Sequence, residues 1–150
     1  MSGAADPNLA REQRFSSALQ QLIGYSLVEW GPDRAVIAYE VAKDHLNRTN
    51  RLHGGIIATL CDTAGGYCGV YCDTPGKTRA TVTLSLTVNF VASVSGGRVT
   101  AEGRKRGGGK TIFFSDVEVR DDEGRLIATA VGTFRYVSAT PVGVKPSVSG

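Results

Sequence analysis

An isolated carboxylate lies in the stretch from Asn47 to Cys72, whose sequence is NRTNRLHGGIIATLCDTAGGYCGVYC. Asp62 is the only ionisable carboxylate between Asp44 and Asp73. Burying an unpaired carboxylate costs several kcal/mol, so Asp62 either has hydrogen-bond partners or opens onto a solvated cleft. It is therefore a candidate catalytic base or nucleophile. A structural carboxylate that caps a loop or pairs with an arginine is the alternative.

A second candidate is the run His53-Gly54-Gly55, which opens the helical pattern that contains Asp62. Free backbone N–H groups at a helix N-terminus favour negative charge, and glycines let a ligand approach those groups closely. This layout is that of an oxyanion hole, where a carbonyl oxygen that becomes anionic would sit. A tight loop with a satisfied core histidine is the alternative for this run.

One chain cannot easily combine the two candidates. Asp62 follows His53 by nine residues, which in a helix is roughly 13 Å along the axis and about half a rotation out of phase. Two antiparallel copies of the helix would bring the acid of one copy to the glycines of the other. We therefore expect a site to which two subunits each contribute one half.

The helix that must hold Asp62 is expected to run for about five turns, from the His-Gly-Gly entry to Cys72. Its apolar face would comprise Ile57, Leu60, Cys61, Ala64, Cys68 and Tyr71. Its other face would be a stripe of small residues around Asp62, namely Gly55, Ala58, Thr59, Gly65, Gly66 and Gly69. Interior glycines make a poor isolated helix, so we expect tertiary burial to hold it, with another backbone or a ligand against the small stripe.

The remaining patterns predict one helix before this segment and a set of strands around it. The first helix would run from Asn8 to Gly24 with Leu9, Phe15, Leu19 and Leu22 as its apolar side. The clearest strand is 80–91, in which Val82, Leu84, Leu86, Val88 and Phe90 would face the core and the intervening polar residues would face away. The other strands are expected at 25–30, 34–41, 98–105, 111–120 and 125–137. Consecutive hairpins predict an α+β fold, an antiparallel sheet wrapped around the one long helix.

Length and composition bound the remaining possibilities. The 150 residues fit one domain, with an ordered core at about 10–137 and a flexible tail at 138–150. No apolar run is long enough to span a membrane and no signal-peptide pattern is present, so we expect a cytoplasmic protein without membrane contacts. The three cysteines fit no zinc or redox spacing, so we expect small buried residues, no metal and no cofactor.

A basic cluster contributes to the net charge of +3. It contains Arg104, Lys105, Arg106 and Lys110, and could bind phosphates or be a solvated hairpin end. A nucleic-acid partner is not expected, because the pattern lacks interleaved aromatic residues. The run Gly107–Thr111 does not make a nucleotide phosphate loop, because Arg104 stands where the first glycine is required. A Ser-His-Asp triad is also unsupported, since no serine lies in a nucleophile-elbow context.

Together these residues resemble a known family. The pattern is similar to that of the hotdog-fold acyl-CoA thioesterases. It consists of Asn47, His53-Gly54-Gly55 and Asp62, then an alternating strand that ends in Asn89-Phe90-Val91, and then Gly109-Lys110-Thr111. The closest type is that of phenylacetate degradation, which includes one branch of the 4-hydroxybenzoyl-CoA thioesterases and thioesterase superfamily member 2. The resemblance covers about residues 10–137. It implies a hotdog fold, which agrees with the order of elements above.

The resemblance also implies roles for individual residues. Gly54 would donate the backbone N–H that polarises the thioester carbonyl, with His53 and Asn47 shaping the loop. Asp62 of the neighbouring subunit would act as base or nucleophile, and Thr83 stands where some members have a serine that positions the water. Gly55 would contact the acyl-CoA substrate. Three cations would contact the phosphates of its coenzyme A part, namely Arg104, Arg106 and Lys110. The family forms dimers that pair into tetramers.

Two other functions stay open at this point. A hotdog dehydratase or hydratase of acyl thioesters would need a His and a carboxylate placed differently from His53 and Asp62. A non-catalytic acyl-CoA-binding or regulatory protein would keep the fold without the chemistry. We expect hydrolysis of an aryl or medium-chain acyl-CoA, although the acyl group itself cannot be read from the sequence.

Overall fold

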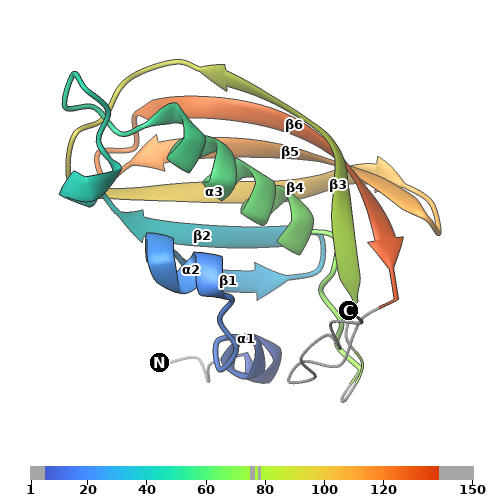
Figure 1. Cartoon of the computed structure of the whole chain (residues 1–150). Coiled ribbons are helices and arrows are strands. Elements are labelled where there is room, and N and C mark those ends of the chain that lie inside the picture. The colour runs from blue at the N-terminus through green and yellow to red at the C-terminus, as the bar shows by residue number, and fades with distance from the viewer. Residues whose placement is uncertain (1–5, 75–76, 78, 139–150) are drawn as a thin grey trace, which may run out of the picture.

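The computed structural model describes residues 6–74, 77 and 79–138, and it has the expected α+β architecture (Figure 1). The expected tail, apart from Ser138, lies outside the described residues. Six antiparallel strands form one sheet in the order β1-β2-β4-β5-β6-β3. Their bounds are β1 (Ser26–Gly31), β2 (Arg34–Glu40), β3 (Ala80–Phe90), β4 (Arg98–Gly108), β5 (Ile112–Asp121) and β6 (Leu126–Val137). Helix α3 (Gly54–Tyr67) lies across the concave face of this curled sheet.

Helix α3 buries the face that its periodicity predicts. Ile57, Leu60, Cys61 and Ala64 are buried against the sheet, and the side chain of Phe134 from β6 packs against Gly65. A Cβ atom at Gly103 of β4 would overlap the carbonyl group of Ala64, so the two backbones approach each other directly. On the small stripe, where another backbone or a ligand was expected, rings of the sheet make the close contacts instead, Phe134 at Gly65 and Phe113 at Gly69. The three cysteines are free and buried, as expected.

The helix ends earlier than expected, at Tyr67 and not at Cys72, so it has 14 residues, about four turns. Tertiary hydrogen bonds explain this end, because side chains of the sheet bind the carbonyl groups that a longer helix would use. The Trp30 indole N–H donates to the carbonyl of Tyr67 (2.9 Å), and the Tyr136 hydroxyl donates to that of Gly69 (2.9 Å). The neighbouring sequence alone does not reveal these partners.

The N-terminal prediction of one helix over Asn8–Gly24 is wrong. The structure has two short helices, α1 (Pro7–Glu12) and α2 (Ala18–Ile23), because Ser17 caps the second by accepting from the N–H of Gln20 (3.1 Å). The expected apolar side is largely uncovered in the single chain, with Phe15, Leu19 and Leu22 exposed by 45%, 50% and 77%.

Strand β3 forms one edge of the sheet, since β6 is its only neighbour among the described strands. It is 11 residues long, and several of its large apolar side chains are exposed, namely Val82, Leu84 and Phe90. A long unprotected edge strand with apolar side chains is a surface that pairs with another strand. No described helix is long and apolar enough to cross a membrane.

Candidate active site

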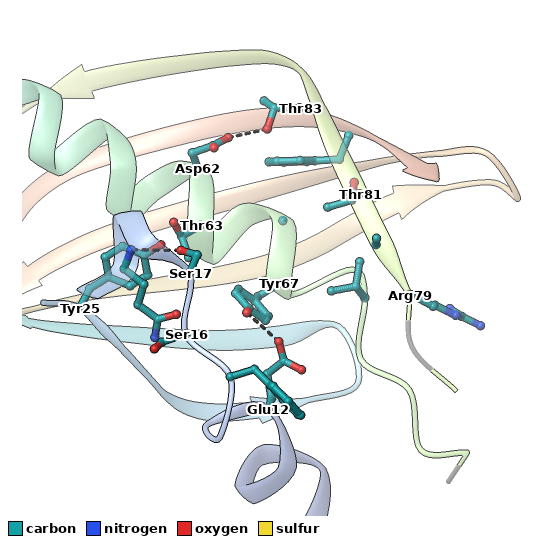
Figure 2. Close-up of a pocket in the computed structure, with 16 residues that line it drawn as sticks. Glu12, Ser16, Ser17, Tyr25, Asp62, Thr63, Tyr67, Arg79, Thr81 and Thr83 are labelled. Atoms are coloured by element: carbon teal, nitrogen blue, oxygen red, sulfur yellow. Dashed lines mark hydrogen bonds between the residues drawn. The ribbon is translucent and has the colours of Figure 1, made fainter. Parts of the chain in front are cut away.

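Asp62 projects from the middle of α3 toward β3 (Figure 2). The Thr83 hydroxyl donates a hydrogen bond of 2.7 Å to its carboxylate. Within the described part of the chain, no Lys, Arg or His nitrogen lies within 4.0 Å of this carboxylate. Asp62 is half-buried, and its described partner is one oriented hydroxyl group. It lacks the ion pair with an arginine that was the structural alternative.

A β-bulge aims Thr83 at Asp62. In the pairing of β3 with β6, Thr83 stands opposite Phe134 and Ser85 opposite Thr133, so Leu84 is an extra residue. One extra residue moves the side chains on one side of the bulge to the other face of the sheet. The expected uniform alternation is therefore wrong in the first half of β3, where Thr83 and not Leu84 faces the helix.

The Asp62 carboxylate opens onto a cavity of about 560 Å³. Its walls come from α3, the first half of β3 and the segment that joins α1 to α2 (Figure 2). On the side away from Asp62, the Tyr67 hydroxyl donates to the Glu12 carboxylate (2.8 Å). Burial and the nearby Glu12 charge raise the pKa of Tyr67, so its hydroxyl stays a neutral donor. This pair of polar groups was not foreseen from the sequence.

Cys61, the neighbour of Asp62 in the chain, is not a competing nucleophile. Its side chain is fully buried on the core face of α3. Burial, with a smaller contribution from the Asp62 charge, raises the pKa of the Cys61 thiol to about 12. A thiol becomes a good nucleophile only as thiolate, so this group is inert at neutral pH.

The helix entry presents one free N–H group. His53 is the exposed N-cap of α3 and its Nδ1 atom accepts from the Gly55 N–H (2.9 Å), so it is not a buried core histidine. The Gly54 N–H has no acceptor among the described residues. The Phe90 ring lies beside it, 3.2 Å from the position that a Gly54 Cβ would take.

Asn47 organises the loop that precedes the helix. Its side-chain oxygen accepts from the N–H groups of Thr49 (2.9 Å) and Arg51 (3.2 Å) and from the Thr49 hydroxyl (2.8 Å). Asn47 and Gly54 line a hollow of about 400 Å³ that also borders Phe90. Asn47 therefore fixes the loop through three hydrogen bonds, and Gly54 opens onto the same hollow.

The two halves of the candidate site are apart in the single chain. Gly54 and Asp62 line different hollows and are eight residues apart on one helix, roughly 12 Å along its axis. Neither histidine accompanies Asp62, because His53 binds Gly55 and the Nδ1 atom of His45 binds the Tyr39 hydroxyl (2.6 Å). A His-carboxylate pair within one chain, as a dehydratase requires, is thus not formed.

The expected cations separate into two groups. Arg104 and Arg106 lie on the outer face of the sheet, where they form ion pairs with Glu102 and Asp116. The structure therefore does not bring them together with Asp62. Lys110 lies instead in a hollow with Arg79 and Lys105, on the helix side. The alternation of side chains along β4 could have shown that Lys105 and Arg104 lie on opposite faces of the sheet.

Replacing Thr83 by Val should lower kcat by roughly 10–100-fold, because a hydrogen bond to a charged group contributes about 1.5–3 kcal/mol. Thr83→Ser is the matched control, since it keeps the hydroxyl and should stay near the wild-type rate. The measurement is the steady-state turnover rate of the two variants. Equal rates for Val and Ser would show that the bond to Asp62 has no part in the reaction.

Comparison with known proteins identifies the family. The family model of the thioesterase superfamily matches residues 49–128. The chain is 30% identical to a Saccharolobus solfataricus protein named as a candidate esterase, over 93% of this chain and 99% of the relative. It is 26% identical to the acyl-coenzyme A thioesterase PaaI of Escherichia coli, over 85% and 89% of the two chains.

Solved structures show the same fold. The E. coli PaaI protein from the phenylacetic acid degradation operon superposes with a TM-score of 0.76 at 25% identity, covering 88% of this chain and 93% of that one. A thioesterase of Haemophilus influenzae superposes with a TM-score of 0.78 over 94% and 97% of the two chains, and its 21% identity supports the fold alone. The fold is thus the hotdog fold. The chain therefore belongs to the thioesterase superfamily and is a hydrolase of thioesters.

Proposed function

We propose that the protein hydrolyses an acyl-CoA, with an aryl or medium-chain acyl group, to the free acid and coenzyme A. The observation that carries this proposal is the Asp62 carboxylate, held by Thr83 on the wall of a cavity beside β3, the edge strand that pairs only with β6 among the described strands. The E. coli relative named acyl-coenzyme A thioesterase supports the substrate class.

The edge strand β3 explains how a second copy would complete the site. Asp62 contacts Thr83 near the start of β3, and Gly54 lies against Phe90 at its end. If β3 pairs antiparallel with its own copy about a two-fold axis at position 87, the Leu84 bulge takes up one residue in each copy and Thr83 stands opposite the second copy's residue 90. Asp62 then faces the Gly54 N–H of the second copy. The same pairing covers the exposed ring of Phe90.

Larger assembly would use another surface. Phe114 and Val131 are exposed on the outer face of the sheet, by 51% and 57%. Pairing of two dimers through this face would cover both side chains. We expect a dimer of dimers on this basis, with the catalytic pairs formed inside each dimer.

The chemistry follows from the two half-sites. The Gly54 N–H at the positive end of α3 would donate to the thioester oxygen and stabilise the oxyanion of the tetrahedral intermediate. Asp62 would take a proton from a water that attacks the carbonyl carbon, and the sulfur of coenzyme A would leave and be protonated. Direct attack by the carboxylate is the other route. The short Asp side chain favours the water route.

A thiol-release screen tests the function directly. Purified protein is given aryl, short-chain and long-chain acyl-CoAs, and release of coenzyme A is followed with a thiol reagent. We expect turnover with aryl or medium-chain substrates. Thermal stabilisation by acyl-CoA without any thiol release over hours would instead identify a binding protein.

Mixed subunits test the shared site. Asp62→Asn and Gly54→Pro chains, each inactive alone, are co-expressed with different affinity tags and purified through both. A mixed dimer has one intact site and one with both changes, so activity should return to about a quarter to a half of wild type. If the doubly tagged protein is as inactive as its parents, the two groups do not meet across subunits.

A further inference from the structure

A basic hollow of about 490 Å³ lies beyond the C-terminal end of α3, on the helix side of the sheet. Its lining includes three cations, Arg79, Lys105 and Lys110, and no carboxylate-bearing residue among those described. Tyr136 forms its wall and is held in place by its hydrogen bond to the carbonyl of Gly69 (2.9 Å). A concave site with one sign of charge and a fixed wall is suited to an anion.

Two cations of this hollow lie against aromatic rings, with little neutralising charge nearby. The Lys105 amine lies 5.9 Å from the ring centres of both Phe113 and Tyr136, and the Arg79 guanidinium lies 6.0 Å from that of Tyr136. In the described part of the chain, Arg79 and Lys110 form no ion pair, and Lys105 has only Asp33 at 3.9 Å. The aromatic faces thus orient Arg79 and Lys105 and leave their charge available to a ligand.

Arg104 and Arg106 show the opposite arrangement. Each already binds a carboxylate, with Arg106 donating to Asp116 at 2.7 Å. Both also lie on the outer face of the sheet, away from α3. An incoming phosphate at these residues would have to compete with carboxylates that are already in place. The hollow on the helix side offers charge without this competition.

The basic hollow adjoins the cavity of Asp62, since Arg79 and Ala80 line both. Arg79 precedes Thr83 by four residues of nearly extended chain, roughly 13 Å at 3.3 Å per residue. A thioester carbonyl beside Asp62 therefore lies within reach of a long arm that ends among the cations. The acyl group would then occupy the other branch of the cavity, toward Tyr67 and Glu12.

We propose that Arg79, Lys105 and Lys110 bind the phosphate groups of coenzyme A, an inference that rests on the acyl-CoA hydrolysis proposed above. The phosphates carry charge that the three cations match, and the pantetheine arm spans the distance from the hollow to the carboxylate. The acyl end and the nucleotide end of the substrate thus occupy two adjoining hollows on either side of Arg79 and Ala80.

The test compares two thioesters of the same acyl group, one of coenzyme A and one of pantetheine, which lacks the nucleotide phosphates. Arg79→Ala/Lys110→Ala should raise KM for the CoA thioester by about 10–100-fold, the effect of losing a charge-assisted hydrogen bond. Its kcat/KM for the pantetheine thioester should stay at the wild-type value. Lys105 is left unchanged because it packs on two aromatic rings.

Arg104→Ala/Arg106→Ala is the matched control, because it removes two cations from the outer face of the sheet. It should leave KM and kcat/KM unchanged for both thioesters. A loss that is equal for both thioesters would overturn the proposal, as would a larger effect of the control. Titration calorimetry with coenzyme A alone tests the hollow without turnover. If Arg79→Ala/Lys110→Ala weakens the binding of coenzyme A, the phosphate site is supported even if no acyl-CoA is hydrolysed. If this variant binds coenzyme A as the wild type does, the site is refuted.

Discussion

Replacing Asp62 by Asn should reduce kcat by about 10²–10⁴-fold, the range expected for loss of a positioned general base. Asn keeps the size of the side chain and an oxygen that can still accept from Thr83, so the change removes the basic oxygen and little else. The measurement is thiol release from the best acyl-CoA at saturating substrate. Asp62→Ala should be at least as slow.

The fold should tolerate this change. Asp62 is half-buried and forms no ion pair with a described residue, so the Asn variant should unfold at a denaturant concentration close to that of wild type. Retained stability with lost activity would assign the carboxylate to the reaction. A stable Asn variant with near wild-type kcat would refute the proposed mechanism.

Gly54→Pro should lower kcat by about 10²–10³-fold, because proline has no N–H to donate to the oxyanion. Gly54 is the first residue of α3, a position where proline suits the helix. The preceding His53 has φ −62° and ψ 134°, the extended conformation that a residue before proline adopts. The substitution therefore removes one hydrogen-bond donor without breaking the helix.

Gly54→Ala is the matched control for this change. It keeps the N–H and adds the Cβ atom, which meets the Phe90 ring at 3.2 Å and requires a small shift of that ring. We expect the Ala variant to retain most of the activity and the two variants to have similar melting temperatures. If Ala and Pro lower kcat equally, crowding of Phe90 and not the lost N–H explains the effect.

Local patterns in the sequence were sufficient for much of the fold. The alternation of strands and turns predicted six strands with nearly the observed bounds, and the 3.6-residue period of 57–64 predicted the buried face of α3. Both signals depend only on the order of apolar and polar side chains along the chain. Burial of the apolar side chains on one face then determines how each helix or strand is oriented. Asp62 could be identified from the sequence as a candidate catalytic group, because a lone carboxylate in an apolar helix is costly to bury without a partner.

Contacts between distant parts of the chain decided the remainder. The bulge at Leu84 depends on the pairing of β3 with β6, and it determines that Thr83 reaches Asp62. The end of α3 depends on Trp30 and Tyr136, which the helix meets only after folding.

The cations illustrate the same division. The sequence placed Arg104, Lys105 and Arg106 in one cluster, and alternation along β4 separates Lys105 from the two arginines, but only the folded sheet shows which of its faces meets the helix. The sequence by itself thus determined which groups can do chemistry and roughly where the helix and strands lie. Tertiary pairing decided which of those groups share a cavity, because a one-residue change in register moves a side chain to the opposite face of a sheet.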